Sequence, residues 1–165
     1  MIKIIFLLLT LVLYSLSKEY HITPLNDKNK IIVDDINNTL KFKNIKKDYL
    51  ILEYFGFGCP VCIAEIPELK KIVFDEKNIQ ILAIHIQKVS NRGIKTFISD
   101  HEINYPIISY KDKDIFYTFA QNNIPYWNGG IPMMIILDKN STPIGYFIGK
   151  VTKSDIIKSL QHYEK

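Results

Sequence analysis

Apolar positions fall into short continuous runs and helical repeats that alternate along the chain. Continuous apolar runs over 48–55 and 79–87 predict two strands that are buried on both faces of a sheet. Between them, apolar residues recur at every third or fourth position, which predicts a helix over 59–77. The positions that carry this repeat are Ile63, Ile66, Leu69, Ile72 and Val73.

The rest of the chain continues the same alternation. A short hairpin, Ile31–Val33 with Thr39–Phe42, is predicted before the first buried strand. Further helices are predicted over 91–103, 114–123 and 152–163, a short strand over 105–110, and a second hairpin from 132–138 and 143–149. The order from 48 onward is βαβαβαββα, which predicts an α/β fold with a mixed sheet flanked by helices.

The first residues have the form of a secretory signal. Lys3 is followed by a run from Ile4 to Leu13 that is apolar except for Thr10, and small residues stand at Ser15 and Ser17. The apolar stretch 4–16 is shorter than the roughly 20 residues that span a bilayer comfortably. A cleaved signal is favoured, and an uncleaved membrane anchor is the alternative. We therefore expect residues 1–17 to direct export to the periplasm or another extracytoplasmic space, and 24–165 to form one domain.

Composition and charge limit the classes of partner that the chain is expected to bind. The chain has 165 residues and a net charge of +4, but its 21 basic residues include a single arginine, Arg92. Lysines are interleaved with acids along the whole chain, whereas nucleic-acid readers use arginine forks and a basic stripe. We expect no nucleic-acid partner and no bound cofactor.

Both cysteines lie in one Cys-Pro-Val-Cys motif. A bridge between Cys59 and Cys62 closes so small a loop that it stabilises little. Zinc requires four ligands, and the four histidines show no zinc-site spacing. Redox exchange is the interpretation that remains. Pro60 suits the first turn of the predicted helix, so Cys59 meets unpaired backbone N–H groups that favour a thiolate. The motif therefore predicts Cys59 as an exposed nucleophile and Cys62 as a buried resolving thiol.

Three other residues have two open interpretations each. Glu53, within an apolar strand, is either a carboxylate that reaches solvent or a buried acid that moves protons for Cys62. Glu65 is either an exposed helix acid or a group that modulates the redox pair. Trp127, the only tryptophan, packs in the core or contacts a partner.

Three segments resemble the thioredoxin superfamily over roughly residues 24–163: "CPVCIAEIP", "GGIPMMIILDKN" and "IGYFIGKVTKSDIIKSL". The resemblance implies a thioredoxin-like fold with an N-terminal hairpin and a cis-proline at Pro132 beside the cysteines. The helix–strand–helix insert 91–123 resembles the TlpA/ResA branch, whereas "LEYFGFGCPVC" resembles the active-site strand of the DsbA oxidases. Gly58 stands where the superfamily usually has tryptophan.

This resemblance implies a thiol-disulfide oxidoreductase whose partner strand pairs with the backbone at Ile131. Pro132, Pro60, Val61 and Trp127 are the other expected partner contacts. The favoured function is reduction of specific exported proteins, for example in cytochrome c maturation, by a monomer that draws electrons from a membrane thiol-disulfide carrier. A DsbA-like thiol oxidase and a non-catalytic binding module are the alternatives, because the direction of electron flow depends on the redox potential.

Overall fold

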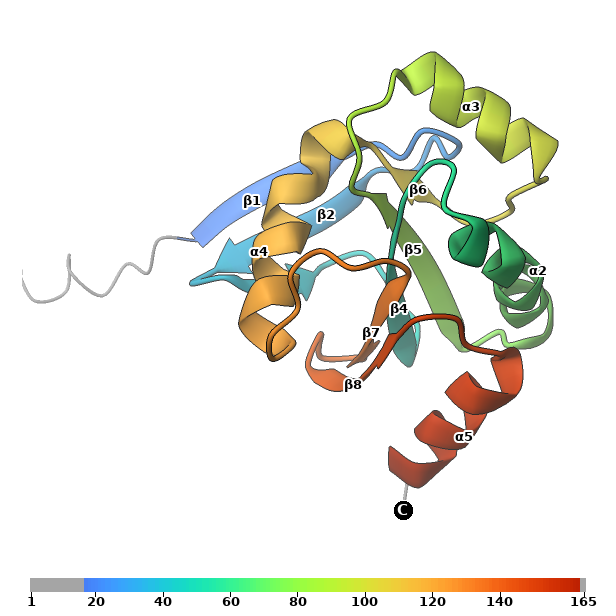
Figure 1. The fold of residues 1–165 in the computed structure, drawn as a ribbon. Helices are drawn as coiled ribbons and strands as arrows, with labels where there is room; N and C mark the ends of the chain where they lie inside the picture. Colours follow the sequence, from blue (N-terminus) through green and yellow to red (C-terminus); the bar gives the residue numbers. More distant parts are fainter. Residues whose placement is uncertain (1–16, 164–165) are drawn as a thin grey trace, which may run out of the picture.

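The computed structural model describes residues 17–163 and places a five-stranded mixed sheet at its centre (Figure 1). Its strand order is β6-β5-β4-β7-β8, with β4 parallel to β5 and antiparallel to β7. The strands are β4 (Tyr49–Phe55), β5 (Ile79–His85), β6 (Ile107–Ile108), β7 (Met133–Asp138) and β8 (Pro143–Ile148). Strand β4, which leads into the cysteine motif, is therefore the central strand, with two strands on either side.

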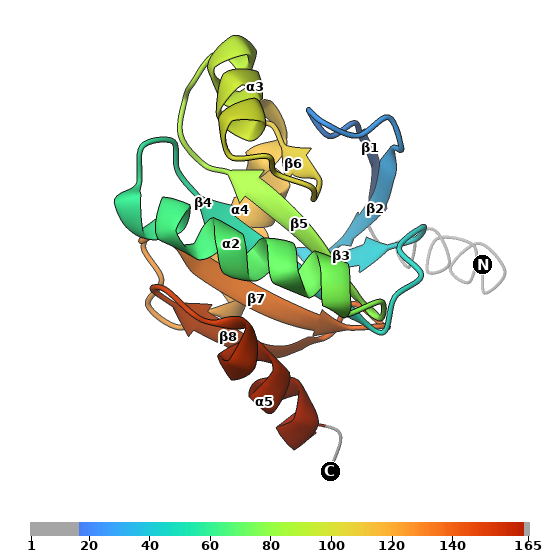
Figure 2. The same cartoon turned by 90° about the vertical axis from the view of Figure 1, so that its right-hand side faces the viewer.

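Helices cover both faces of this sheet, as Figure 2 shows. Helix α2 lies across one face, and α4 lies on the opposite face together with a three-stranded antiparallel sheet β1-β2-β3. The helices are α2 (Pro60–Asp75), α3 (Asn91–Asp100), α4 (Lys113–Asn123) and α5 (Lys153–Tyr163), with a 3₁₀ turn η1 (Tyr110–Asp112). The small sheet consists of β1 (Ser17–Ile22), β2 (Ile31–Ile36) and β3 (Thr39–Phe42).

The predicted α/β, thioredoxin-like architecture is confirmed, including the N-terminal hairpin and the insert that α3, β6 and α4 form. Strand β1 was not predicted, because it is mostly exposed and Ile22 is its one buried residue. The strand predicted over 105–110 is only two residues long. Its end is taken over by η1, where the Ser109 hydroxyl accepts the Lys111 N–H and caps the 3₁₀ turn.

Alternating residues of β4 enter two separate apolar cores. The α2-side core contains Ile51 and Phe55 of β4, together with buried residues of α2, α3 and α5. The α4-side core contains Leu52 and Tyr54, together with α4 and the small sheet. Because side chains alternate along a strand, a polar residue at position 53 must enter the α2-side core.

Within residues 17–163, no helix is both long enough and apolar enough to cross a bilayer. The predicted signal or anchor lies in residues 1–16, outside the described part of the chain, apart from Ser17 at the start of β1.

Candidate active site

The cysteine motif begins directly after a tight turn at the end of β4. Cys59 donates its backbone N–H to the Gly56 carbonyl (3.3 Å), which closes the turn Gly56–Cys59. Gly58 has a φ of 75°, a conformation that glycine adopts without the steric cost that other residues incur. Cys59 caps the N-terminus of α2 and Pro60 is its first residue. The predicted position of the motif at a helix N-terminus is confirmed.

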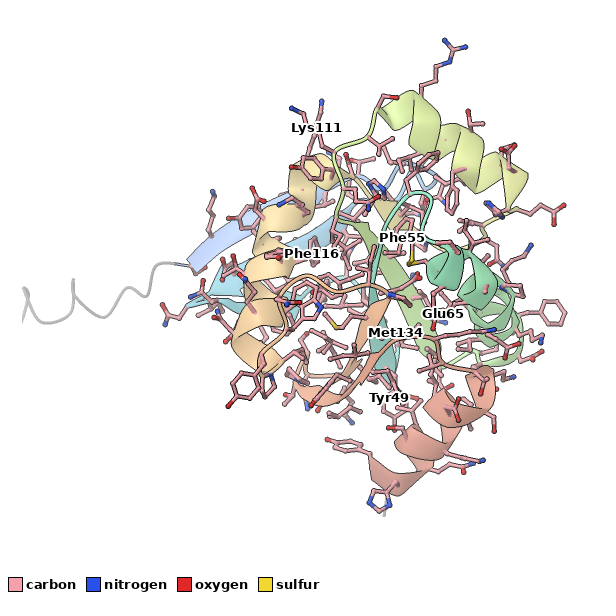
Figure 3. All side chains as sticks on the ribbon, in the orientation of Figure 1. Tyr49, Phe55, Glu65, Lys111, Phe116 and Met134 are labelled. Atoms are coloured by element: carbon pink, nitrogen blue, oxygen red, sulfur yellow. A yellow bond between two sulfur atoms is a disulfide. The ribbon has the colours of Figure 1, made fainter. Side chains whose placement is uncertain are left out.

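The two sulfur atoms form a disulfide, visible as a yellow bond at the start of α2 in Figure 3. Cys62 is only 1% exposed, whereas Cys59 is partly exposed. The Cys62 backbone N–H donates to the Cys59 sulfur (3.2 Å), one of the helix-end groups expected to stabilise charge on that sulfur. A partner in solution can therefore reach Cys59 more easily than Cys62, as predicted. Pro60 and Val61, between them, are exposed.

The Ile131-Pro132 peptide bond is cis, as the resemblance to the thioredoxin superfamily implies. Ile131 lies against the active-site turn, because a side chain at Gly56 would collide with its Cδ1 atom. The Pro132 carbonyl accepts the Gly149 N–H (2.8 Å), which ties this loop to the segment leading into α5. The cysteines and the proline, about seventy positions apart in sequence, therefore meet at one end of the central sheet.

Glu53 is 2% exposed and enters the α2-side core, opposite Ala83 and Met134 on the flanking strands. Its Oε2 atom has no hydrogen-bond partner among the described residues. Burial, and to a lesser degree the charge of Glu65, raises the pKa of the Glu53 carboxyl well above its usual range. Of the two interpretations of Glu53, the structure supports the buried acid.

Glu65 is fully buried on the side of α2 that faces the sheet, near the loop that leads into α5 (Figure 3). Its Oε1 atom accepts the Val151 N–H (2.7 Å), and its Oε2 atom has no partner among the described residues. Burial raises the pKa of Glu65 to about 7, although the Val151 bond and the charge of Lys150 oppose this shift. Glu65 is therefore not an exposed helix acid. The sequence contained a signal for this burial, because Glu65 follows Cys62 by three residues and so lies on the same buried face of α2.

Trp127 packs in the α4-side core. Its ring contacts those of Tyr54 (5.3 Å between centroids) and Tyr117 (4.9 Å), and its indole N–H donates to the Gly130 carbonyl (2.7 Å). The neighbouring Tyr126 is fully exposed instead. The structure therefore places Trp127 in the packing interpretation, and Tyr126 is the aromatic ring that this loop presents to solvent.

Two further buried residues, Tyr105 and His85, were not predicted. The pKa of Tyr105 is raised by burial and by the charges of Glu53 and Glu65, which places its hydroxyl in the field of both carboxyls. His85 is fully buried at the end of β5, and its Nε2 atom accepts the Phe57 N–H. Neither stands in a motif: the β4–β5 register places His85, and the loop before β6 places Tyr105.

A family model described as the AhpC/TSA family matches residues 25–142. The chain belongs to the AhpC/TSA family. This match covers β2 to β7, and therefore includes the cysteine motif, both buried acids and the cis-proline.

This AhpC/TSA-family chain is similar to a curated relative in sequence and to solved structures in fold. The thiol-disulfide oxidoreductase ResA of Bacillus cereus is 22% identical over 135 residues, covering 81% of this chain and 73% of that protein. StoA from Bacillus subtilis has a TM-score of 0.66 at 13% identity, over 88% and 98% of the two chains. A secreted thiol-disulfide isomerase from Corynebacterium glutamicum has a TM-score of 0.67 at 20% identity, over 90% and 86%. With its Cys59–Cys62 disulfide, the chain is a thiol-disulfide oxidoreductase of thioredoxin-like fold.

Proposed function

We propose that the Cys59–Cys62 pair exchanges disulfides with cysteine-containing proteins outside the cytoplasm. The observation that carries this proposal is the arrangement at the start of α2: a disulfide whose Cys59 is partly exposed lies beside the cis-proline loop and shares its core with two buried carboxyls. A structural disulfide would need neither the exposed cysteine nor the acids. Burying unpaired acids costs free energy, which a stapling role does not recover.

In the reducing direction, the Cys59 thiolate attacks a partner disulfide and a mixed disulfide forms, with release of one partner thiolate. Cys62 then loses its proton to Glu53 and attacks the Cys59 sulfur atom. The second partner thiolate leaves, and the Cys59–Cys62 disulfide forms. Two electrons have passed to the partner, whose thiolates take up protons. Glu65 modulates this step, because its charge acts on Glu53.

Partner contact in this proposal is made by the exposed rim of the site. The backbone at Ile131 pairs with an extended partner segment, as strand addition allows, and Pro132 presents no N–H group beside the disulfide. Pro60 and Val61 are exposed next to Cys59 and line the other side of the partner cysteine. Trp127 supports this loop from within the core, where it bonds Gly130.

The favoured direction is reduction of specific exported partners, for example apocytochromes during cytochrome c maturation. The TlpA/ResA-like insert and the similarity to ResA support this proposal. A membrane thiol-disulfide carrier would return electrons to the pair, and the segment 1–17 would bring the domain to that compartment, by a cleaved signal or as an anchor.

The test is the redox equilibrium of the pair against glutathione, together with alkylation of the reduced protein at mildly acidic pH. We expect a potential near that of reductants, about −270 mV, with Cys59 labelled first. A value near about −120 mV would indicate an oxidase instead. Cys62→Ser should trap mixed disulfides with partners, whereas Cys59→Ser, the matched control, should trap none. If neither cysteine exchanges with glutathione, the proposal fails.

A further inference from the structure

A buried histidine ring is hydrogen bonded to the backbone of the active-site turn. The Phe57 N–H donates to the Nε2 atom of His85 at 3.1 Å. His85 ends β5 opposite Phe55, the last residue of β4, and none of its side chain is accessible to solvent. The bond therefore joins the ends of two central strands at the point where the chain turns toward Cys59.

The turn has no internal acceptor for this N–H. Its own closing bond uses the Cys59 N–H and the Gly56 carbonyl, so the Phe57 amide, inside the turn, must find its acceptor elsewhere. Gly56 allows the backbone to pass close to Ile131 and Gln87, and Gly58 allows a positive φ, but neither glycine fixes the turn in place. The hydrogen bond from the Phe57 N–H to the His85 ring fixes the turn in place.

Aromatic contacts keep the ring in this orientation. Phe55 meets the His85 ring edge-on, with 5.2 Å between centroids. Phe97 of α3 stacks on Phe55 (6.1 Å) and meets the Phe57 ring edge-on (5.6 Å). The turn and the histidine are thus enclosed by one aromatic cluster, which leaves the ring little room to turn away.

Only a neutral ring whose proton is on Nδ1 can accept at Nε2. Burial lowers the pKa of His85 to about 4, with an opposing influence of the Gln87 backbone, so the ring is neutral at pH 7. Charge on His85 is therefore not part of its role. Its contribution is one hydrogen-bond acceptor at a fixed place.

We propose that His85 is a positioning residue, which fixes the Gly56–Gly58 turn and thereby aligns Cys59 with the N-terminal N–H groups of α2. This inference rests on the proposed function, since it assigns Cys59 the thiolate role. When the turn is loosened, those N–H groups stabilise the thiolate less well. The pKa of the Cys59 thiol then rises, and the equilibrium of the pair moves toward the disulfide. The loss of one net hydrogen bond corresponds to about a fivefold change in that equilibrium.

Three variants of the full chain separate this role from simple packing. His85→Phe keeps the ring but removes the acceptor, whereas His85→Gln removes the ring but keeps an acceptor. His162→Phe makes the same substitution on the exposed side of α5 and serves as the control. The readouts are the glutathione equilibrium of the pair and the rate of Cys59 alkylation at pH 6.

We expect His85→Phe to move the equilibrium about fivefold toward the disulfide and to slow alkylation similarly. We expect His85→Gln to keep the glutathione equilibrium and the alkylation rate close to their wild-type values. His162→Phe should match wild type in both. The proposal is overturned if His85→Phe behaves as wild type, or if His85→Gln shifts both readouts as far as His85→Phe does. If His85→Phe fails to fold, nitrogen NMR of wild type decides, because a proton on Nε2 would contradict the bond. Failure of the proposed function is distinct, since the wild-type pair itself would then not exchange.

Discussion

Glu53 and Tyr54 are neighbours in β4, yet their side chains enter cores of different character. Tyr54, in the α4-side core, donates its hydroxyl to the Phe116 carbonyl at 2.8 Å. Trp127, in the same core, donates its N–H to the Gly130 carbonyl. The buried polar groups of these two aromatic residues are therefore satisfied, and their bonds support packing.

The α2-side core is different, because buried polar atoms there lack partners. Among residues 17–163, the buried side-chain atoms without a hydrogen bond include Oε2 of Glu53 and Oε2 of Glu65. Each belongs to a residue on the face of the sheet where Cys62 is buried. Unpaired buried polar groups destabilise a fold, so their concentration beside the disulfide indicates that this face serves chemistry and the other serves stability.

The largest effect should come from the α4-side core. Phe116 is fully buried, so Phe116→Ala should lower the free energy of unfolding by about 3–5 kcal/mol, as the ring's transfer energy is lost and a cavity remains. The glutathione equilibrium of the folded fraction should not change. Urea unfolding at pH 7 measures the free energy of unfolding, and the redox titration measures the glutathione equilibrium. Phe74→Ala, at a residue 75% exposed on α2, is the control that should alter neither.

The second prediction concerns the α2-side core and the pH dependence of the free energy of unfolding. The pKa of Glu65 is about 7 in the folded protein and 4.5 as its ordinary value. A folded-state pKa above the unfolded one means that stability is full below pH 4.5 and is lost as pH rises toward 7. Glu65→Gln removes this loss and keeps an oxygen for the Val151 N–H. At pH 8 the variant should be more stable than wild type by about 3 kcal/mol, with little difference at pH 4.

A neighbouring acid on the same helix supplies a control of opposite sign. The Lys71 hydrogen bond, more than that from the Lys153 backbone, lowers the pKa of Glu68. Its stabilising contribution is present above its ordinary pKa and is lost on acidification. Glu68→Gln should therefore be less stable than wild type at pH 8. Urea unfolding curves at pH 4 and pH 8 measure both variants. If Glu65→Gln and Glu68→Gln change the free energy of unfolding in the same direction, burial is not the cause of the raised Glu65 pKa.

The third prediction concerns rate. If Glu53 accepts the Cys62 proton, Glu53→Gln should slow the resolving step at neutral pH by about 100-fold, equivalent to about 2.7 kcal/mol. Attack by Cys59 should stay nearly unchanged, because the Cys59 thiolate is stabilised by the helix end. The variant should also melt higher, since no charge is buried. Rapid-mixing kinetics with a model disulfide across pH separates the two steps. A rate profile and melting point that match wild type would make Glu53 an ordinary strand residue.

Burial explains which parts of the fold the sequence could predict. Strands β4 and β5 and helix α2 are covered by other elements, so their apolar patterns are continuous or helical and can be read locally. Strand β1 carries no such pattern, because its hydrogen bonds to β2 do not depend on side-chain type. The helix that opens with the cysteine motif was predictable for the same reason as the strands.

The site was predictable only where chemistry and local pattern coincide. Cys59, Cys62 and Glu53 stand out because each is unusual for its element. His85 does not, because its role depends on a turn 28 positions earlier, and that distance is bridged only by the β4–β5 register. Tyr105 likewise lies in the field of both acids although it belongs to neither β4 nor β5. Contacts set by register leave no trace in spacing, so a single sequence does not contain a visible signal for them.

The substitution with the smallest expected effect gives the sharpest test of whether the two faces of β4 differ in function. It removes a single oxygen atom from Tyr54, the residue that follows Glu53. Tyr54→Phe removes the hydroxyl that donates to the Phe116 carbonyl, so it should cost about 1 kcal/mol and lower the melting temperature by about 2–4 °C. Since Tyr54 faces the α4-side core, the glutathione equilibrium and the rate of the resolving step should match wild type. Tyr126→Phe, at a fully exposed ring, controls for the substitution itself. Thermal unfolding and the redox titration are measured on the same samples. If Tyr54→Phe shifts the redox equilibrium as much as Glu53→Gln does, the two faces of β4 are not functionally separate, and the unpartnered atoms of the α2-side core need another explanation.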